Sequence, residues 1–161
     1  MVTISPAIQS DAAAILELQR SAYQSEARLY NDWSLPPLTQ MLDSMLQDMA
    51  TMTVLKAIQD EKLVGSVRGI LQDGICNIGR LIVEPSHQRR GIGSALLRAI
   101  ETNFPTARAF SLFTGGRSEE NLRLYRRHDY RETHREQVAP HLIMIFLQKQ
   151  AAPVIQLSGK C

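Results

Sequence analysis

A glycine-rich stretch between two regular segments carries the most readable chemistry in this sequence. Gln88-Arg89-Arg90-Gly91-Ile92-Gly93 follows an apolar segment that stops at Pro85 and precedes a segment with helical periodicity. The first N–H groups of a helix have no intrahelical acceptor, and the helix dipole makes this end positive. The two glycines leave these groups open to a ligand, and the two arginines add positive charge. The stretch predicts a binding site for a diphosphate.

Taken alone, a Gly-x-Gly before a helix is also typical of a simple tight turn. It is not the dinucleotide-binding fingerprint, because no third glycine follows at the required spacing and the preceding strand belongs to a hairpin. It is not a P-loop either, because no Gly-Lys-Ser/Thr follows.

Two motifs together resemble a known family. The stretch at 88–93 matches the Gln/Arg-x-x-Gly-x-Gly/Ala motif of the GCN5-related N-acetyltransferases (GNAT), and the flanking residues 81–85 and 94–97 are also similar to that family. About thirty residues downstream, Asn121-Leu122-Arg123-Leu124-Tyr125 resembles the family's Asn-x-x-x-Tyr helix. The resemblance in the order of elements extends to about residue 148.

This resemblance implies acetyl-CoA as the cofactor, with coenzyme A as the product. The backbone of one strand would pair with the pantetheine arm, the loop would hold the pyrophosphate, Asn121 would contact the pantetheine, and Tyr125 would lie near the sulfur. The cofactor residues implied are Leu81, Ile82, Val83, Gln88, Arg89, Arg90, Gly91, Ile92, Gly93, Ser94, Asn121 and Tyr125.

The chemistry of acyl transfer to an amine sets further requirements. A primary amine with a pKa of about 10.4 is mostly protonated at neutral pH and must lose a proton before it attacks a thioester. The carbonyl oxygen that gains charge needs a donor, for which a backbone N–H near Ile82 is the candidate. Tyr125 is the candidate general acid for the leaving thiolate. The alternative for Tyr125 is a core tyrosine packed on the sheet.

The sequence offers no clear general base. Some family members place a glutamate on the fourth strand, and counting back from the loop brings that position to Asn77, which cannot accept a proton. Glu84 is the nearest carboxylate, but a solvent-facing side chain is an equally good interpretation of this residue. We therefore assign no base and expect a water chain or an acceptor that arrives as the free amine. A second departure from the family is Asp129, which precedes Tyr130 where a glycine is usual.

Residues for the acceptor amine come from the first two helices, their connection and the strands. By resemblance these are Glu26, Tyr30 and Trp33, with Arg68 and Arg80 on apolar strands. A buried charge is costly unless it is paired, so the two arginines would neutralise a carboxylate on the acceptor. The alternatives are a structural ion pair with Glu26 or exposure at a strand edge.

Composition and charge exclude several classes of protein. The chain of 161 residues has two cysteines and four histidines without zinc-ligand spacing, so we expect no metal site and no disulfide framework. No apolar run is long enough to span a membrane, and no secretory signal is visible, so we expect a cytoplasmic protein.

The net charge is +2, but residues 1–75 carry −4 and residues 76–161 carry +6, which favours an anionic ligand in the second half. Random surface charge is the alternative. The arginines lack interleaved aromatics, so we expect no nucleic acid partner.

These residues need a sheet and helices to position them. The pattern predicts a single GNAT-like domain over residues 1–148 of the α+β (mixed α/β) class, followed by a loose tail at 149–161. We expect a mostly antiparallel mixed sheet of about seven strands, with about four helices packed on both faces. The expected strands are 2–8, 53–59, 62–72, 75–83, 107–113, 128–135 and 141–148, and the expected helices are 11–23, 38–49, 91–102 and the one capped by Ser118. Residues 24–36 are expected to be irregular.

The function that follows is transfer of an acetyl group from acetyl-CoA to a primary amine of a small molecule or peptide. The alternative is a non-catalytic acyl-CoA-binding or sensing domain on the same fold, which the asparagine at 77 favours and Tyr125 disfavours. We expect a monomer or a homodimer.

Overall fold

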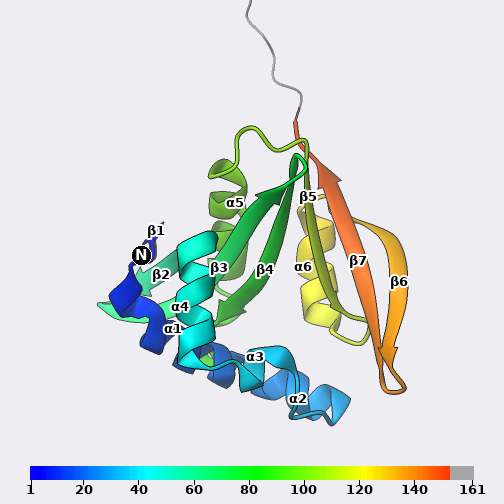
Figure 1. Cartoon of the computed structure of the whole chain (residues 1–161), viewed down its shortest axis with the longest axis horizontal. Helices are drawn as coiled ribbons and strands as arrows, with labels where there is room; N and C mark the ends of the chain where they lie inside the picture. The colour runs from blue at the N-terminus through cyan, green and yellow to red at the C-terminus, as the bar shows by residue number, and fades with distance from the viewer. Residues whose placement is uncertain (153–161) are drawn as a thin grey trace, which may run out of the picture.

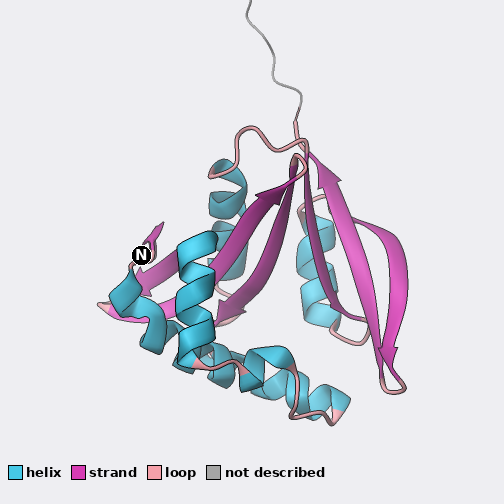
Figure 2. Ribbon diagram, in the orientation of Figure 1, coloured by secondary structure: helices cyan, strands magenta, loops and turns pink. Residues whose placement is uncertain are grey.

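A twisted seven-stranded sheet organises the computed structural model, which describes residues 1–152 (Figures 1 and 2). Neighbouring strands are antiparallel except for one parallel pair, β4 and β5, and the strand order is β1-β2-β3-β4-β5-β7-β6. The predicted mixed, mostly antiparallel sheet is confirmed. The strands are β1 (Thr3–Pro6), β2 (Thr53–Gln59), β3 (Lys62–Gln72), β4 (Ile75–Val83), β5 (Ala109–Gly115), β6 (Arg131–Ala139) and β7 (Leu142–Gln150). The predicted tail lies mostly outside the described residues, and β7 continues to Gln150 within them.

Helices cover both faces of the sheet. α1 and α4 lie on one face and α5 on the other (Figure 1). Within residues 1–152, no helix combines the length and the apolar character needed to cross a membrane. The helices are α1 (Ala12–Ala22), α2 (Gln24–Tyr30), α3 (Pro36–Thr39), α4 (Leu42–Thr51), α5 (Ile92–Thr102) and α6 (Glu119–Arg127).

The segment between α1 and α4 differs from the prediction. Residues 24–36 are not irregular, because they contain α2, which buries Ala27 and Tyr30. Pro36 occupies the first turn of α3, where its missing N–H is no loss. The predicted helix at 38–49 is divided, since α3 ends at Thr39 and α4 begins at Leu42. The sequence did not predict α2 and α3 because each has fewer than two turns, which is too short for a detectable helical periodicity.

Apolar clusters on both faces hold the helices on the sheet. On the α5 face, Leu96, Leu97 and Ile100 are completely buried. On the opposite face, Ile15 of α1 and Met45 of α4 belong to a second buried cluster. Met45 of α4 is therefore core, whereas Met41 at the N-cap of the same helix is exposed.

The parallel pair β4–β5 is the feature that shapes the site. β4 leads into α5 and α5 leads into β5, and such a crossover allows the two strands to run in the same direction. Only Ile75–Asn77 pairs with Ala109–Ser111, and the two strands then separate (Figure 1). Past this point β5 keeps its pairing with β7, while β4 keeps its pairing with β3.

A β-bulge lies on β4 just before its end. Ser66 pairs with Ile82 and Arg68 pairs with Gly79, so one residue of β3 faces two residues of β4. Arg80, within the bulge, has a φ of 49°. A bulge bends the strand and removes local ladder hydrogen bonds, so the last residues of β4 are turned relative to β5.

The turn after α6 keeps its shape without the glycine that is usual in the family. Asp129 adopts a φ of 70°, and aspartate is one of the few residues that visit this left-handed region. The N–H of Tyr130 donates to the carbonyl of Tyr125, which closes the helix end. The Tyr130 side chain is buried, and its hydroxyl donates to Glu101 at 2.7 Å.

The close approach of α5 to β3 leads to a stability prediction. A Cβ at Gly65 would lie 2.8 Å from Leu96 Cδ1 and 3.1 Å from the Ile82 carbonyl oxygen. We expect Gly65→Ala to lower the free energy of unfolding by about 1–3 kcal/mol, because α5 or β4 must shift. Gly79→Ala is the matched control, since its Cβ would meet only Arg68 Nε at 3.9 Å. Urea unfolding of both variants checks this, and equal stabilities would contradict it.

Candidate active site

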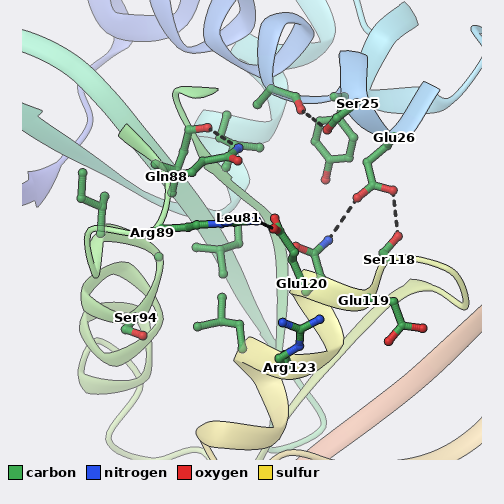
Figure 3. Close-up of a pocket in the computed structure, with 18 of the residues that line it drawn as sticks. Ser25, Glu26, Leu81, Gln88, Arg89, Ser94, Ser118, Glu119, Glu120 and Arg123 are labelled. Atoms are coloured by element: carbon green, nitrogen blue, oxygen red, sulfur yellow. Dashed lines mark hydrogen bonds and ion pairs between the residues drawn. The ribbon is translucent and has the colours of Figure 1, made fainter. Parts of the chain in front are cut away.

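A cavity of about 920 Å³ opens beyond the point where β4 and β5 separate. It lies between the end of β4, the start of α5, the start of α6, and α2 (Figure 3). Most of the residues predicted to bind the cofactor line it. They are Leu81, Ile82, Val83, Gln88, Arg89, Gly91, Ile92, Gly93, Ser94 and Asn121.

The start of α5 follows a glycine that lines the cavity. Gly91 is the N-cap with a φ of 83°, and it has no side chain to cover the first N–H groups of the helix. The α5 N-terminus has no side-chain cap, and Gly91, Ile92, Gly93 and Ser94 of this end line the cavity. With the helix dipole, the first N–H groups of the helix favour negative charge.

Arginines on the loop and on α6 add positive charge to this end. Arg89 donates to Glu120 at 2.5 Å across the cavity mouth (Figure 3). Arg123 and Arg127 also line the cavity, one helical turn apart on α6. Arg90, which was predicted to bind the cofactor, is exposed and is not among the lining residues.

Tyr125 lies beside the cavity rather than among the residues that line it. Its side chain is 6% exposed and its ring centroid is 6.1 Å from that of Tyr130. Burial raises the pKa of Tyr125 above its ordinary value, and Tyr23 and Glu26 raise it further. The phenol therefore stays protonated at neutral pH, which a proton donor requires.

Glu26 of α2 reaches α6 across the cavity. Its Oε2 accepts from the Ser118 hydroxyl at 2.7 Å, and its Oε1 is 3.4 Å from Asn121 Nδ2 (Figure 3). Burial raises the pKa of Glu26, the Ser118 hydrogen bond lowers it, and Glu120 raises it. The net direction is upward. Tyr30 does not line the cavity, but its hydroxyl contacts that of Ser118 at 2.8 Å.

The other residues predicted for the acceptor lie elsewhere. Arg68 pairs with Asp48 at 2.5 Å, so the structural ion pair exists, but with Asp48 instead of Glu26. Arg80 donates to Gln40 at 3.2 Å, and burial, followed by Arg68, lowers its pKa. Trp33 is 52% exposed. None of these three lines the cavity among the described residues.

Neither residue considered for the base position on β4 has the properties of a base. Asn77 is exposed, donates to Gln72 at 2.9 Å and is absent from the cavity lining. Hydrogen bonds from the Ser86 side chain and then from His87 lower the pKa of Glu84 to about 2. A carboxylate with so low a pKa accepts a proton poorly at neutral pH.

Sequence reasoning missed part of the lining. Tyr23, Leu29 and His87 line the cavity without any local signal that places them there. The Arg123–Arg127 pair had a local signal, because residues four apart share a helix face. Ser118 was predicted as the α6 cap and is the N-cap residue, but its side chain makes no capping hydrogen bond.

The chain matches a protein family over most of its length. Residues 21–151 match the family described as acetyltransferase (GNAT) domain. The chain therefore belongs to the GNAT acetyltransferase family, and the resemblance in its motifs is confirmed. No curated protein matches the sequence.

Solved structures of the family share the fold at low sequence identity. PaiA N-acetyltransferase from Thermoplasma acidophilum, in complex with coenzyme A, is 14% identical with a TM-score of 0.77, covering 94% of this chain and 99% of that one. Ribosomal-protein-S18-alanine N-acetyltransferase from Escherichia coli is 15% identical with a TM-score of 0.77, covering 96% and 98%. A phosphinothricin acetyltransferase from Sinorhizobium meliloti, in complex with acetyl-CoA, is 17% identical with a TM-score of 0.75, covering 92% and 88%.

The left-handed N-cap of α5 gives a prediction about the loop itself. Gly91→Ala is expected to lower the free energy of unfolding by about 1–2 kcal/mol, because a side chain disfavours a φ of 83° even where nothing lies within 4 Å. Gly93→Ala is the control inside the helix, where alanine is expected to leave stability unchanged or raise it by up to about 1 kcal/mol. Urea denaturation measures both, and a neutral Gly91→Ala would rule out the strained N-cap.

Proposed function

We propose that this protein is an acetyl-CoA-dependent N-acetyltransferase that acts on a primary amine of a small molecule or peptide. The observation that carries the proposal is the cavity itself, which joins an anion site at the start of α5 to the gap between β4 and β5. The pyrophosphate of the cofactor needs the anion site, and the pantetheine arm that follows it needs the gap between the strands.

The residues present fit the cofactor. The free N–H groups behind Gly91 and Gly93 suit the pyrophosphate, with Arg89 exchanging Glu120 for a phosphate oxygen. Arg123 and Arg127 suit the remaining phosphate. The other lining residues predicted from the sequence complete the cofactor site.

When bound, acetyl-CoA supplies a thioester carbon that an amine can attack. The chain's part is to orient the amine and to move protons. A backbone N–H near Ile82, at the bulge of β4, is our candidate donor to the carbonyl oxygen as it gains charge. Tyr125, with its protonated phenol, is our candidate acid for the leaving sulfur.

Binding and transfer can be tested together. We expect titration calorimetry to detect binding of coenzyme A, and acetyl-CoA to release free thiol only when a primary amine is added. A panel of 1,4-diaminobutane, lysine and a short peptide covers different acceptor charges. Binding without thiol release for every amine would favour the non-catalytic acyl-CoA-binding domain, and absence of binding would contradict both functions.

The role of Tyr125 has its own test. Tyr125→Phe is expected to lower kcat by about 10²-fold or more, because a general acid contributes about 10²- to 10⁴-fold, with little change in coenzyme A affinity. Tyr130→Phe is the matched control. Tyr130 is a neighbouring buried tyrosine whose hydroxyl donates to Glu101, and neither residue lines the cavity. The Tyr130→Phe variant is expected to lose about 1 kcal/mol of stability and keep kcat within about twofold. Equal kcat values for the two variants would remove Tyr125 from the mechanism.

A further inference from the structure

The residues around Glu26 form a chain of hydrogen bonds with a defined direction. The Ser118 hydroxyl has one proton, which it donates to Glu26 Oε2 at 2.7 Å. Its 2.8 Å contact with Tyr30 must therefore be donated by the tyrosine hydroxyl. The Tyr30 oxygen in turn accepts the backbone N–H of Arg117 at 2.9 Å. The two donors nearest Glu26, the Ser118 hydroxyl and the Asn121 amide, point to its two oxygens, an arrangement that the ionised carboxylate satisfies.

Ser118 makes these bonds instead of the hydrogen bond expected of a helix N-cap. A serine at the N-cap normally accepts a hydrogen bond from the second or third residue of its helix. Here the side chain makes no such bond, and it bridges α2 and α6 instead. A residue that departs from a local rule with a strong alternative partner is expected at functional sites.

Glu26 also has the right exposure and position for proton transfer. Three carboxylates line the cavity, and two of them, Glu119 and Glu120, are exposed. Glu26 is half-buried, which raises its pKa toward the range in which a carboxylate is an effective base. Its Oε1 has only the long 3.4 Å contact with Asn121, and it is the oxygen left for a substrate proton.

From this geometry we infer that Glu26 is the general base that accepts a proton from the acceptor amine, with Ser118 and Tyr30 as positioning residues. The inference rests on the proposed function. The ammonium gives one proton to Glu26, which passes it to water. The amine nitrogen then forms a bond to the thioester carbon and the bond from carbon to sulfur breaks. The phenol of Tyr125 protonates the thiolate and recovers a proton from the nitrogen. One amide, one thiol and one released proton balance the reaction.

The groups that face Glu26 define its response to pH. Glu120 approaches from α6, and the tyrosines around it are Tyr23, Tyr30 and Tyr125, whose pKa values are all raised, first by burial. These tyrosines are therefore neutral throughout the acid and neutral range. The acid limb of kcat/KM then reports Glu26, with activity falling as pH drops through its pKa.

The test compares Glu26→Gln with wild type across pH, using the most active amine of the panel. We expect kcat/KM to fall by about 10²- to 10³-fold at pH 7, on the scale of general-base catalysis, and to recover toward wild type near pH 10, where the amine is free. Glu119→Gln is the charge control. It removes one negative charge from the same cavity, and it is expected to keep the acid limb and change the amine KM by a few fold at most.

Ser118→Ala provides an independent readout, should Glu26→Gln fold poorly. Loss of a hydrogen bond that lowers the pKa of Glu26 is expected to move the acid limb to higher pH. Three outcomes would overturn the assignment of Glu26 as the general base. They are an unmoved acid limb in Ser118→Ala, a loss of kcat/KM in Glu26→Gln that is the same at all pH values, or a rise in amine KM with kcat unchanged. In each case retained coenzyme A binding and amine-dependent thiol release by wild type would leave the proposed function standing. Absence of wild-type thiol release would remove both.

Discussion

The early separation of β4 from β5 is the constraint on which the rest of this structure depends. Parallel strands normally exchange hydrogen bonds along their length, but here the ladder stops after three residue pairs. The bulge at Arg80 bends β4 at the same end. Buried backbone groups that lose a strand partner need another, because an unpaired group costs free energy. Under the proposed function, a cofactor with amide groups of its own would meet this need by lying along β4 in place of a strand.

The same separation gives the cavity two ends with different electrostatics. At one end the α5 N-terminus, Arg89 and Arg123 present positive charge, while at the other Glu26 accepts a hydrogen bond from Ser118. Under the proposed function this arrangement directs a phosphate-bearing cofactor and a cationic amine to opposite ends. Electrostatic complementarity of this kind orients both reactants and disfavours the reversed placement.

The features that were predictable from the sequence are those encoded within a few residues. The junction from strand to helix needs only a strand end, two glycines and a helix start, all between Leu81 and Ser94, and this local structure forms as expected. The long strands and α5 follow from clear periodicity, and the antiparallel pairing of β3 with β4 follows from the two residues between them, Asp73-Gly74, which favour a hairpin turn. Short helices such as α2 were not predictable, because their burial against distant segments, rather than their own pattern, stabilises them.

The sequence by itself determined the family, the strand-and-helix order and the glycine-rich junction between β4 and α5, because local hydrogen bonding and periodicity encode them. Only the tertiary structure decided which side chains meet in the cavity. Glu26 and Ser118 are 92 positions apart, and Arg68 takes Asp48 as its partner although Glu26 was equally available by charge. Periodicity tells which face of an element is buried but not which remote segment covers it. The assignment of Glu26 therefore became possible only when α2 was placed against the start of α6.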